Sequence, residues 1–105
     1  MIIRSAFLEG SVAEADRAAF DAQLAGPVVD AIRTYPGIQG VYLRRLVQAD
    51  AGTPPIYAVF DLFFADLAAM EAALATPTRQ AVRAQIAQVM TRFQGRVYHQ
   101  VFAQD

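Results

Sequence analysis

The sequence contains no cysteine and no lysine, and its only histidine is His99. Without cysteine, the chain has no thiol nucleophile, disulfide, iron–sulfur cluster or thiolate zinc site. Without lysine, it forms no Schiff base and has no phosphate-loop lysine. A single histidine does not supply a multi-histidine metal site within one chain. We therefore expect no metal ion and no cofactor.

The sequence also has no large net charge and no long apolar run. The formal net charge is -1 over 105 residues, so no strong field attracts nucleic acid or an anionic membrane. No segment approaches the roughly 18 uninterrupted apolar residues of a membrane-spanning helix. The first residues, MIIRSAFLEG, carry an arginine and no small-residue cleavage site, which makes a poor signal peptide. We expect a soluble cytoplasmic protein without nucleic-acid or membrane partners.

Hydrophobic residues, in contrast, make up 55% of the chain, and they are densest at residues 56–64, IYAVFDLFF. This segment is apolar on both faces, whereas a strand with one wet face alternates apolar and polar residues. If helices cover one face of the sheet, the simplest cover for the other is a second copy of it. We therefore expect a homodimer through the sheet faces, with Asp61 as an unusual buried charge.

The order of elements predicts the fold. Strands are predicted at residues 2–8, 39–48, 56–64 and 96–103, with a turn at Glu9-Gly10 after the first strand. The helical segments are a long one interrupted by Gly26-Pro27, a short one capped by Asp66, and one that is capped by Thr76, has Pro77 at its first position and ends at Gly95. The order βαββαβ favours an α+β, ferredoxin-like single domain over residues 1–105, with an antiparallel sheet of strand order 4-1-3-2.

Two segments resemble a known family. The run IYAVFDLFFADLAAMEAALATPTRQAV is similar to EthD-type proteins of the dimeric α/β-barrel superfamily, in which a strand with a central acidic residue leads into a short helix, a small-residue loop and a second helix. The run YPGIQGVYLRR resembles the Pro-Gly turn and second strand of the same family. The resemblance implies a small homodimer that forms a dimeric α/β barrel, of a kind often found in degradation or polyketide pathways.

The resemblance also bears on activity. Some relatives in the superfamily are cofactor-independent oxygenases or isomerases acting on aromatic or lactone substrates. EthD-type proteins commonly place a histidine two residues before the proline of the first helix. Here that proline is Pro27, and the position holds Ala25.

Three side chains are candidates for catalysis. Asp61 is either a general acid or base, or a buried charge paired with an arginine at the dimer interface. His99 titrates near neutral pH when unperturbed, and is either a catalytic base or a hydrogen-bonded structural residue. In the predicted strand order, Asp61 and His99 lie on the strands on either side of the first strand. Neighbouring strands are about 4.8 Å apart, so the backbones of these two residues are roughly 9–10 Å apart. Arg4 bridges them if all three side chains point to the same face.

Aromatic residues are the candidates for ligand binding. Side chains with apolar rings and polar tips suit a pocket for a flat apolar molecule, although core or interface packing is the alternative. Alternation along the third strand places Tyr57, Asp61 and Phe63 on one face. The candidates are Tyr42, Tyr57, Phe63 and Tyr98.

Two functions therefore stay open, beside a purely structural dimer with no pocket, which would follow if aromatic residues fill the space between helices and sheet. The first is an EthD-like homodimer that binds a small apolar or aromatic metabolite. As an enzyme it would catalyse cofactor-free isomerisation or oxygenation, with Asp61 or His99 as base and Arg4 stabilising negative charge. The second is a non-catalytic binding or accessory dimer, which Ala25 in the histidine position favours.

Overall fold

The computed structural model describes all 105 residues. Its four strands are β1 (Ile2–Val12), β2 (Gly40–Arg45), β3 (Ile56–Phe64) and β4 (Phe93–Ala103). They form one antiparallel sheet in the spatial order β2-β3-β1-β4, so the predicted α+β, ferredoxin-like topology is confirmed.

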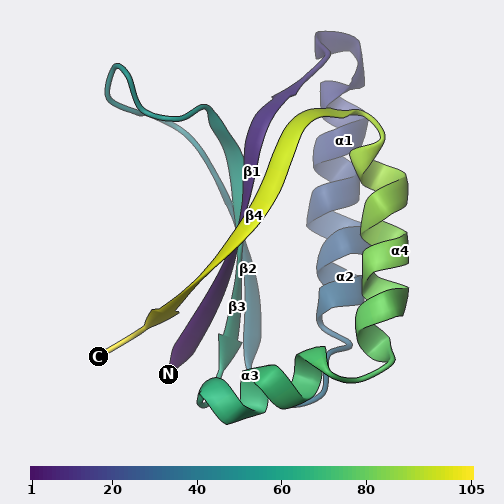
Figure 1. The fold of residues 1–105 in the computed structure, drawn as a ribbon. Helices are drawn as coiled ribbons and strands as arrows, with labels where there is room; N and C mark the ends of the chain where they lie inside the picture. Colours follow the sequence, from purple (N-terminus) through teal and green to yellow (C-terminus); the bar gives the residue numbers. More distant parts are fainter.

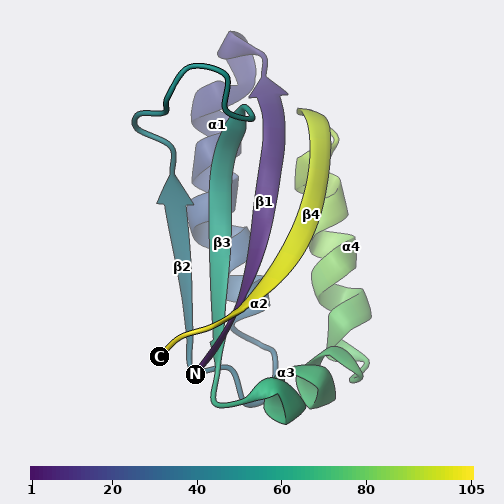
Figure 2. The same ribbon diagram turned by 60° about the vertical axis from the view of Figure 1, so that its left-hand side comes forward.

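The helices lie on one side of this sheet. They are α1 (Arg17–Gln23), α2 (Val29–Ile32), α3 (Leu67–Leu74) and α4 (Thr78–Met90). Figure 1 shows α1, α2 and α4 against one face, with α3 near the end of the sheet where the two termini lie. Figure 2 shows the strands in front of the helices, and no other element covers this second face. None of the helices combines the length and apolar composition that crossing a bilayer requires.

The segment between β1 and β2 is helical, but its winding changes near Pro27. A short 3₁₀ helix (Glu14–Asp16) precedes α1, and a π-helical turn (Leu24–Val28) joins α1 to α2. Proline lacks an N–H and its ring crowds the preceding turn, so the predicted interruption takes the form of a wider turn. The side chains at four-residue spacing are buried against the sheet: Phe20, Leu24, Val28 and Ile32.

Two predicted helix starts have different outcomes. Asp66 caps α3, since its carboxylate accepts a hydrogen bond of 2.8 Å from the backbone N–H of Ala69. The prediction that Thr76 caps the following helix is wrong. Its hydroxyl instead donates to the carbonyl oxygen of Ala73, at 2.7 Å, and so closes the preceding helix.

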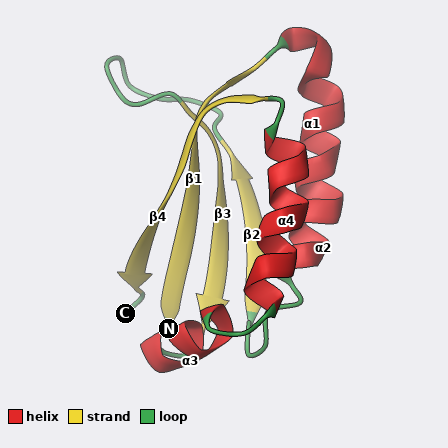
Figure 3. Cartoon of the chain, turned by 45° about the vertical axis from the view of Figure 1, so that its right-hand side comes forward, coloured by secondary structure: helices red, strands yellow, loops and turns green.

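The predicted turn at Glu9-Gly10 is also wrong, because β1 continues to Val12. The register pairs Gly10 with Gly95, which lies inside β4 rather than at a helix end. These glycines have φ values of 150° and 155°. A Cβ on Gly10 would overlap the carbonyl oxygen of Gln94, so the backbones approach too closely for any side chain. The two glycines therefore allow the long β1–β4 pair seen in Figure 3.

Candidate functional site

The two faces of the sheet separate the predicted catalytic residues. Residues directly opposite each other on paired strands share a face, and successive residues alternate. Ser5 lies opposite Asp61 and therefore shares its face, which is the uncovered one. Arg4 and His99 line a cavity on the helix-covered face. The prediction that Arg4 bridges Asp61 and His99 is therefore wrong.

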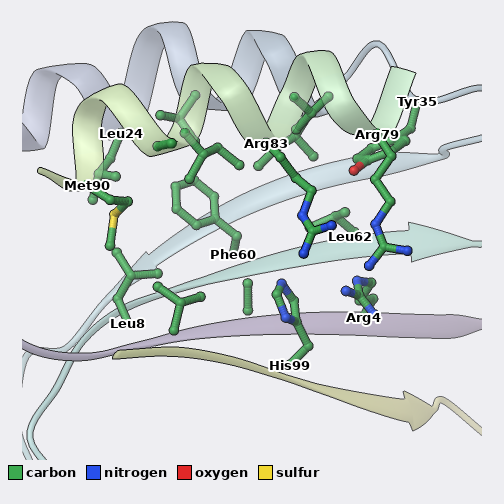
Figure 4. A pocket seen from close by; sticks show the side chains of 17 residues that line it. Arg4, Leu8, Leu24, Tyr35, Phe60, Leu62, Arg79, Arg83, Met90 and His99 are labelled. Atoms are coloured by element: carbon green, nitrogen blue, oxygen red, sulfur yellow. The ribbon is translucent and has the colours of Figure 1, made fainter. Parts of the chain in front are cut away.

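The cavity lies between the sheet and the helices α2 and α4, and its volume is about 320 Å³. Thirteen of its 17 lining residues are hydrophobic, so its walls are largely apolar. Figure 4 shows Leu8, Leu24 and Met90 at one end and Phe60 near the middle. This size and lining are typical of a small-molecule pocket, at the lower end of the usual range.

The other end of the cavity is basic. In Figure 4, Arg79 and Arg83 extend from α4 toward the sheet, while Arg4 and His99 extend from the sheet toward α4. The hydroxyl of Tyr35 lies near Arg79. No aspartate or glutamate lines the cavity.

Burial and the positive charges at the basic end lower the pKa values of two residues that lie there, His99 and Arg4. His99 lies at the open side of the cavity, and its partial burial, followed by the positive charges of Arg4, Arg79 and Arg83, lowers its pKa to about 4. Burial and the charge of Arg79 likewise lower the pKa of Arg4. His99 is therefore neutral at pH 7, so one ring nitrogen has a lone pair that can accept a proton or a hydrogen bond.

Asp61 has its partners within its own chain. The hydroxyl of Ser5 donates to one carboxylate oxygen at 2.7 Å, and Nε of Arg44 donates to the other at 2.6 Å. The residue is only 7% exposed, even though the face is uncovered. Asp61 is thus a buried charge paired with an arginine of its own chain, and the predicted place of this pair at a dimer interface stays a prediction.

The four predicted ligand-binding aromatic residues do not meet in one place. Tyr42 and Phe63 pack beside Asp61 on the uncovered face, with ring centroids 5.4 Å apart, and line a shallow depression there. Tyr98 stacks on Phe7 of the same face, with centroids 5.2 Å apart. None of the four lines the cavity under the helices.

Tyr57 lies on the helix side, so the alternation that places it beside Asp61 is wrong. The pairing of β1 with β3 shifts register after Leu8, and Tyr57 is the extra residue. Such a bulge turns a side chain to the other face. The hydroxyl of Tyr57 donates to the side chain of Asp21, and its ring packs against Phe20.

Sequence reasoning missed Arg79, Arg83 and Tyr35. A signal for the arginines is present in the sequence. Residues 78–90, TRQAVRAQIAQVM, contain no acidic residue, and the two arginines lie four positions apart beside the apolar stripe that begins with Val82. That spacing places both on one helix face without an acidic partner.

Comparisons with known proteins show where this fold recurs. No protein-family model matches the chain, and no curated protein matches its sequence. An EthD family protein from Bacillus halodurans has a similar structure, with a TM-score of 0.79 and 18% identity over 100% of this chain and 99% of that one. The predicted EthD resemblance is therefore confirmed at the level of the fold.

Two further solved structures share this fold. A DABB family protein with a ferredoxin-like fold, from Mesorhizobium loti, has a TM-score of 0.69 and 14% identity over 98% of this chain and 96% of that one. A cofactor-independent oxygenase from Streptomyces nogalater has a TM-score of 0.60 and 17% identity over 98% and 90%. Identities this low show a common fold and leave the activity to be argued from the site.

Proposed function

We propose that the protein is a homodimer that binds a small apolar or aromatic metabolite in the cavity between helices and sheet. The observation that carries the binding role is the cavity itself. It combines a volume of about 320 Å³, walls made mostly of hydrophobic side chains, and polar groups gathered at one end. A pocket of this kind binds the body of a ligand by burial and orients it by a few polar contacts.

The catalytic version of this proposal uses His99 as the base. Its neutral imidazole would take a proton from an acidic carbon of the ligand, and the electron pair would remain on the ligand as an enolate. Arg4, which lines the same cavity, would stabilise the enolate charge. Return of the proton to a different carbon gives isomerisation. Alternatively, dioxygen adds to the carbanion to form a C–O bond, and return of the proton to the outer oxygen gives a hydroperoxide, with dioxygen as the oxidant. The presence of a cofactor-independent oxygenase among proteins of this fold supports this version.

Of the two candidate bases, we prefer His99 to Asp61 because of where each lies. Both oxygens of Asp61 already accept hydrogen bonds, and the cavity does not reach it. We propose that Asp61 orders the uncovered face, by holding Ser5 and Arg44 in fixed positions.

A specific observation favours the alternative, a non-catalytic binding or accessory dimer. An imidazole with a pKa of about 4 is a weak base at neutral pH, whereas general bases work best with a pKa near the operating pH. Ala25, which stands in the family's histidine position, does not line the cavity. His99→Ala separates the two versions: an enzyme loses turnover while it keeps ligand affinity, and a binding protein shows no turnover to lose.

Dimerisation is proposed from the character of the uncovered face. Register places Ile3, Phe63 and Phe102 in one row across the sheet, and Phe7 and Tyr98 in another. Phe102 is 46% exposed in the isolated chain. The row between these two contains Tyr42, Asp61, Ser5 and Gln100, and in it Asp61 and Ser5 are buried. Apolar rows left exposed on an uncovered face are typical of an interface, and the same face of a second copy would cover them.

Native mass spectrometry of gently desalted protein tests the cavity. We expect added mass from a co-purified small molecule, and loss of that mass in Ala87→Phe, which introduces a ring into the cavity wall. Ala84→Phe is the matched control, because Ala84 lies on the same helix but does not line the cavity. Retention of the ligand in Ala87→Phe, or its loss in both variants, would contradict the assignment of the binding site.

A further inference from the structure

We propose that the ligand of this cavity is an organic oxyanion, with a carboxylate bound among Arg4, Arg79 and Arg83 and an apolar body directed toward Leu8 and Met90. This inference rests on the proposed function, because it assumes that the cavity binds a small molecule. It adds the chemical class of the ligand and its orientation.

The first support is the convergence of positive charge in one place. Arg79 and Arg83 reach down from α4 and Arg4 reaches up from β1, so the three guanidinium groups face a common space beside His99 (Figure 4). They come from elements far apart in the sequence. Arg4 and Arg79 are partly buried and Arg83 is exposed at the mouth of the cavity. Like charges held this close repel one another, and a bound anion would relieve the repulsion.

The second support is that these three arginines have no acidic partner. Four of the chain's nine arginines form ion pairs with aspartate or glutamate: Arg33, Arg44, Arg45 and Arg96. The three in the cavity form none, and no acidic side chain lines it. The whole chain carries a net charge of -1, so this cluster is not the result of a generally basic surface. We therefore expect the ligand to carry the negative charge that neutralises these arginines.

The third support is the polarity of the cavity along its length. The basic groups occupy one end, and Leu8, Leu24 and Met90 occupy the other (Figure 4). A free inorganic anion would leave that apolar end unfilled, and a neutral apolar molecule would leave the arginines unneutralised. A carboxylate suits the planar, forked donors of arginine. A molecule with a carboxylate head and an apolar body satisfies both ends.

Calorimetric titration with matched pairs of ligands tests the inference. The acids are hexanoate, octanoate, decanoate and 4-phenylbutanoate, and each is paired with its neutral amide. We expect at least one acid to bind tenfold or more tightly than its amide, and more tightly than inorganic phosphate. We also expect this preference to fall about tenfold in the double variant Arg79→Gln/Arg83→Gln. Glutamine keeps a good helix propensity in place of each charge.

Two control variants distinguish charge from disturbed structure. Arg92→Gln removes a charge just beyond α4, from a residue that does not line the cavity, and should leave affinity for the acid unchanged. Arg79→Lys/Arg83→Lys keeps both charges but not the forked donors, and should retain more of the preference for acid over amide than the glutamine variant does. Loss of the preference in the lysine variant, with its circular dichroism unchanged, would overturn a charge-based account.

The remaining outcomes separate this inference from the proposed function. Equal affinity for acids and amides would overturn the oxyanion assignment while it supports a small-molecule cavity. Inorganic phosphate bound as tightly as every acid would overturn the apolar body. Absence of binding by all probes, together with the absence of a co-purified ligand, would overturn both proposals.

Discussion

At the scale of single residues, the state of His99 is the most direct test of the cavity's electrostatics. We expect its imidazole to titrate with a midpoint near 4 in a proton NMR titration, because burial and Arg4, Arg79 and Arg83 disfavour its charged form. Arg83→Gln should raise the midpoint, and Arg92→Gln should not. A midpoint near 6.5 in the unliganded protein would contradict the description of the basic end.

The same shift makes stability depend on pH in a stated direction. Between pH 6.5 and 4 the unfolded chain takes up a proton on His99 that the folded chain does not, so the free energy of unfolding decreases as the pH falls. Above pH 6.5 both states are neutral and the contribution vanishes. Carboxylates titrate in the lower part of this window. The difference between wild type and His99→Gln therefore isolates the histidine, and the variant should show the shallower decrease.

Asp61 shows why residue identity alone did not locate the site. A lone carboxylate in an apolar strand is typical either of a catalytic group or of a paired charge. The hydrogen bonds from Ser5 and Arg44 decide for pairing, and those partners come from two other strands. Which residues lie opposite Asp61 depends on the register of the sheet, and nothing local to residues 56–64 specifies that register.

At the scale of elements, the paired glycines of β1 and β4 allow a sharp prediction. Gly10→Ala should lower the free energy of unfolding by more than about 1 kcal/mol, because alanine is incompatible with a positive φ and its Cβ meets the carbonyl oxygen of Gln94. Gly26→Ala is the matched control. Gly26 lies in the helical segment, where an added Cβ meets no atom outside its own helix but is crowded by the ring of Pro27, so alanine there should change the free energy of unfolding by less than about 1 kcal/mol. Urea unfolding measures both, and equal effects would refute the role given to Gly10.

Two element boundaries set by local contacts were predicted well, whereas the Thr76 cap failed although its hydrogen bond to Ala73 is also local. Asp66 caps α3 through its own side chain, and Pro27 disturbs the helix through its own ring. Other predictions failed where contacts between distant segments override the local sequence preference. Glu9-Gly10 has the composition of a turn, but pairing with β4 keeps the chain extended through it. Tyr57 leaves the expected alternation for a similar reason, since the bulge arises from how β3 pairs with β1.

At the scale of the whole molecule, the uncovered sheet face predicts association. We expect size-exclusion chromatography with light scattering to report a dimer of the 11.4 kDa chain. Phe102→Glu should shift it to a monomer, because a charge would then have to be buried in the interface. Leu67→Glu is the control, since Leu67 is exposed to a similar extent, 48% against 46%, but lies on α3. A monomeric wild type would remove the proposed role of the sheet face.

The sequence alone determined which reactive side chains are missing, the order of the elements and the ferredoxin-like sheet. Composition, apolar periodicity and local capping are properties of short segments, so they are readable before folding. It also marked His99 and Arg4 as candidates. Only the tertiary structure decided that Asp61 faces away from them and that Arg79 and Arg83 join them. The face on which a strand residue lies, and which helix residues come to stand above it, depend on pairing register and helix packing. Both are set by contacts between segments far apart in the chain.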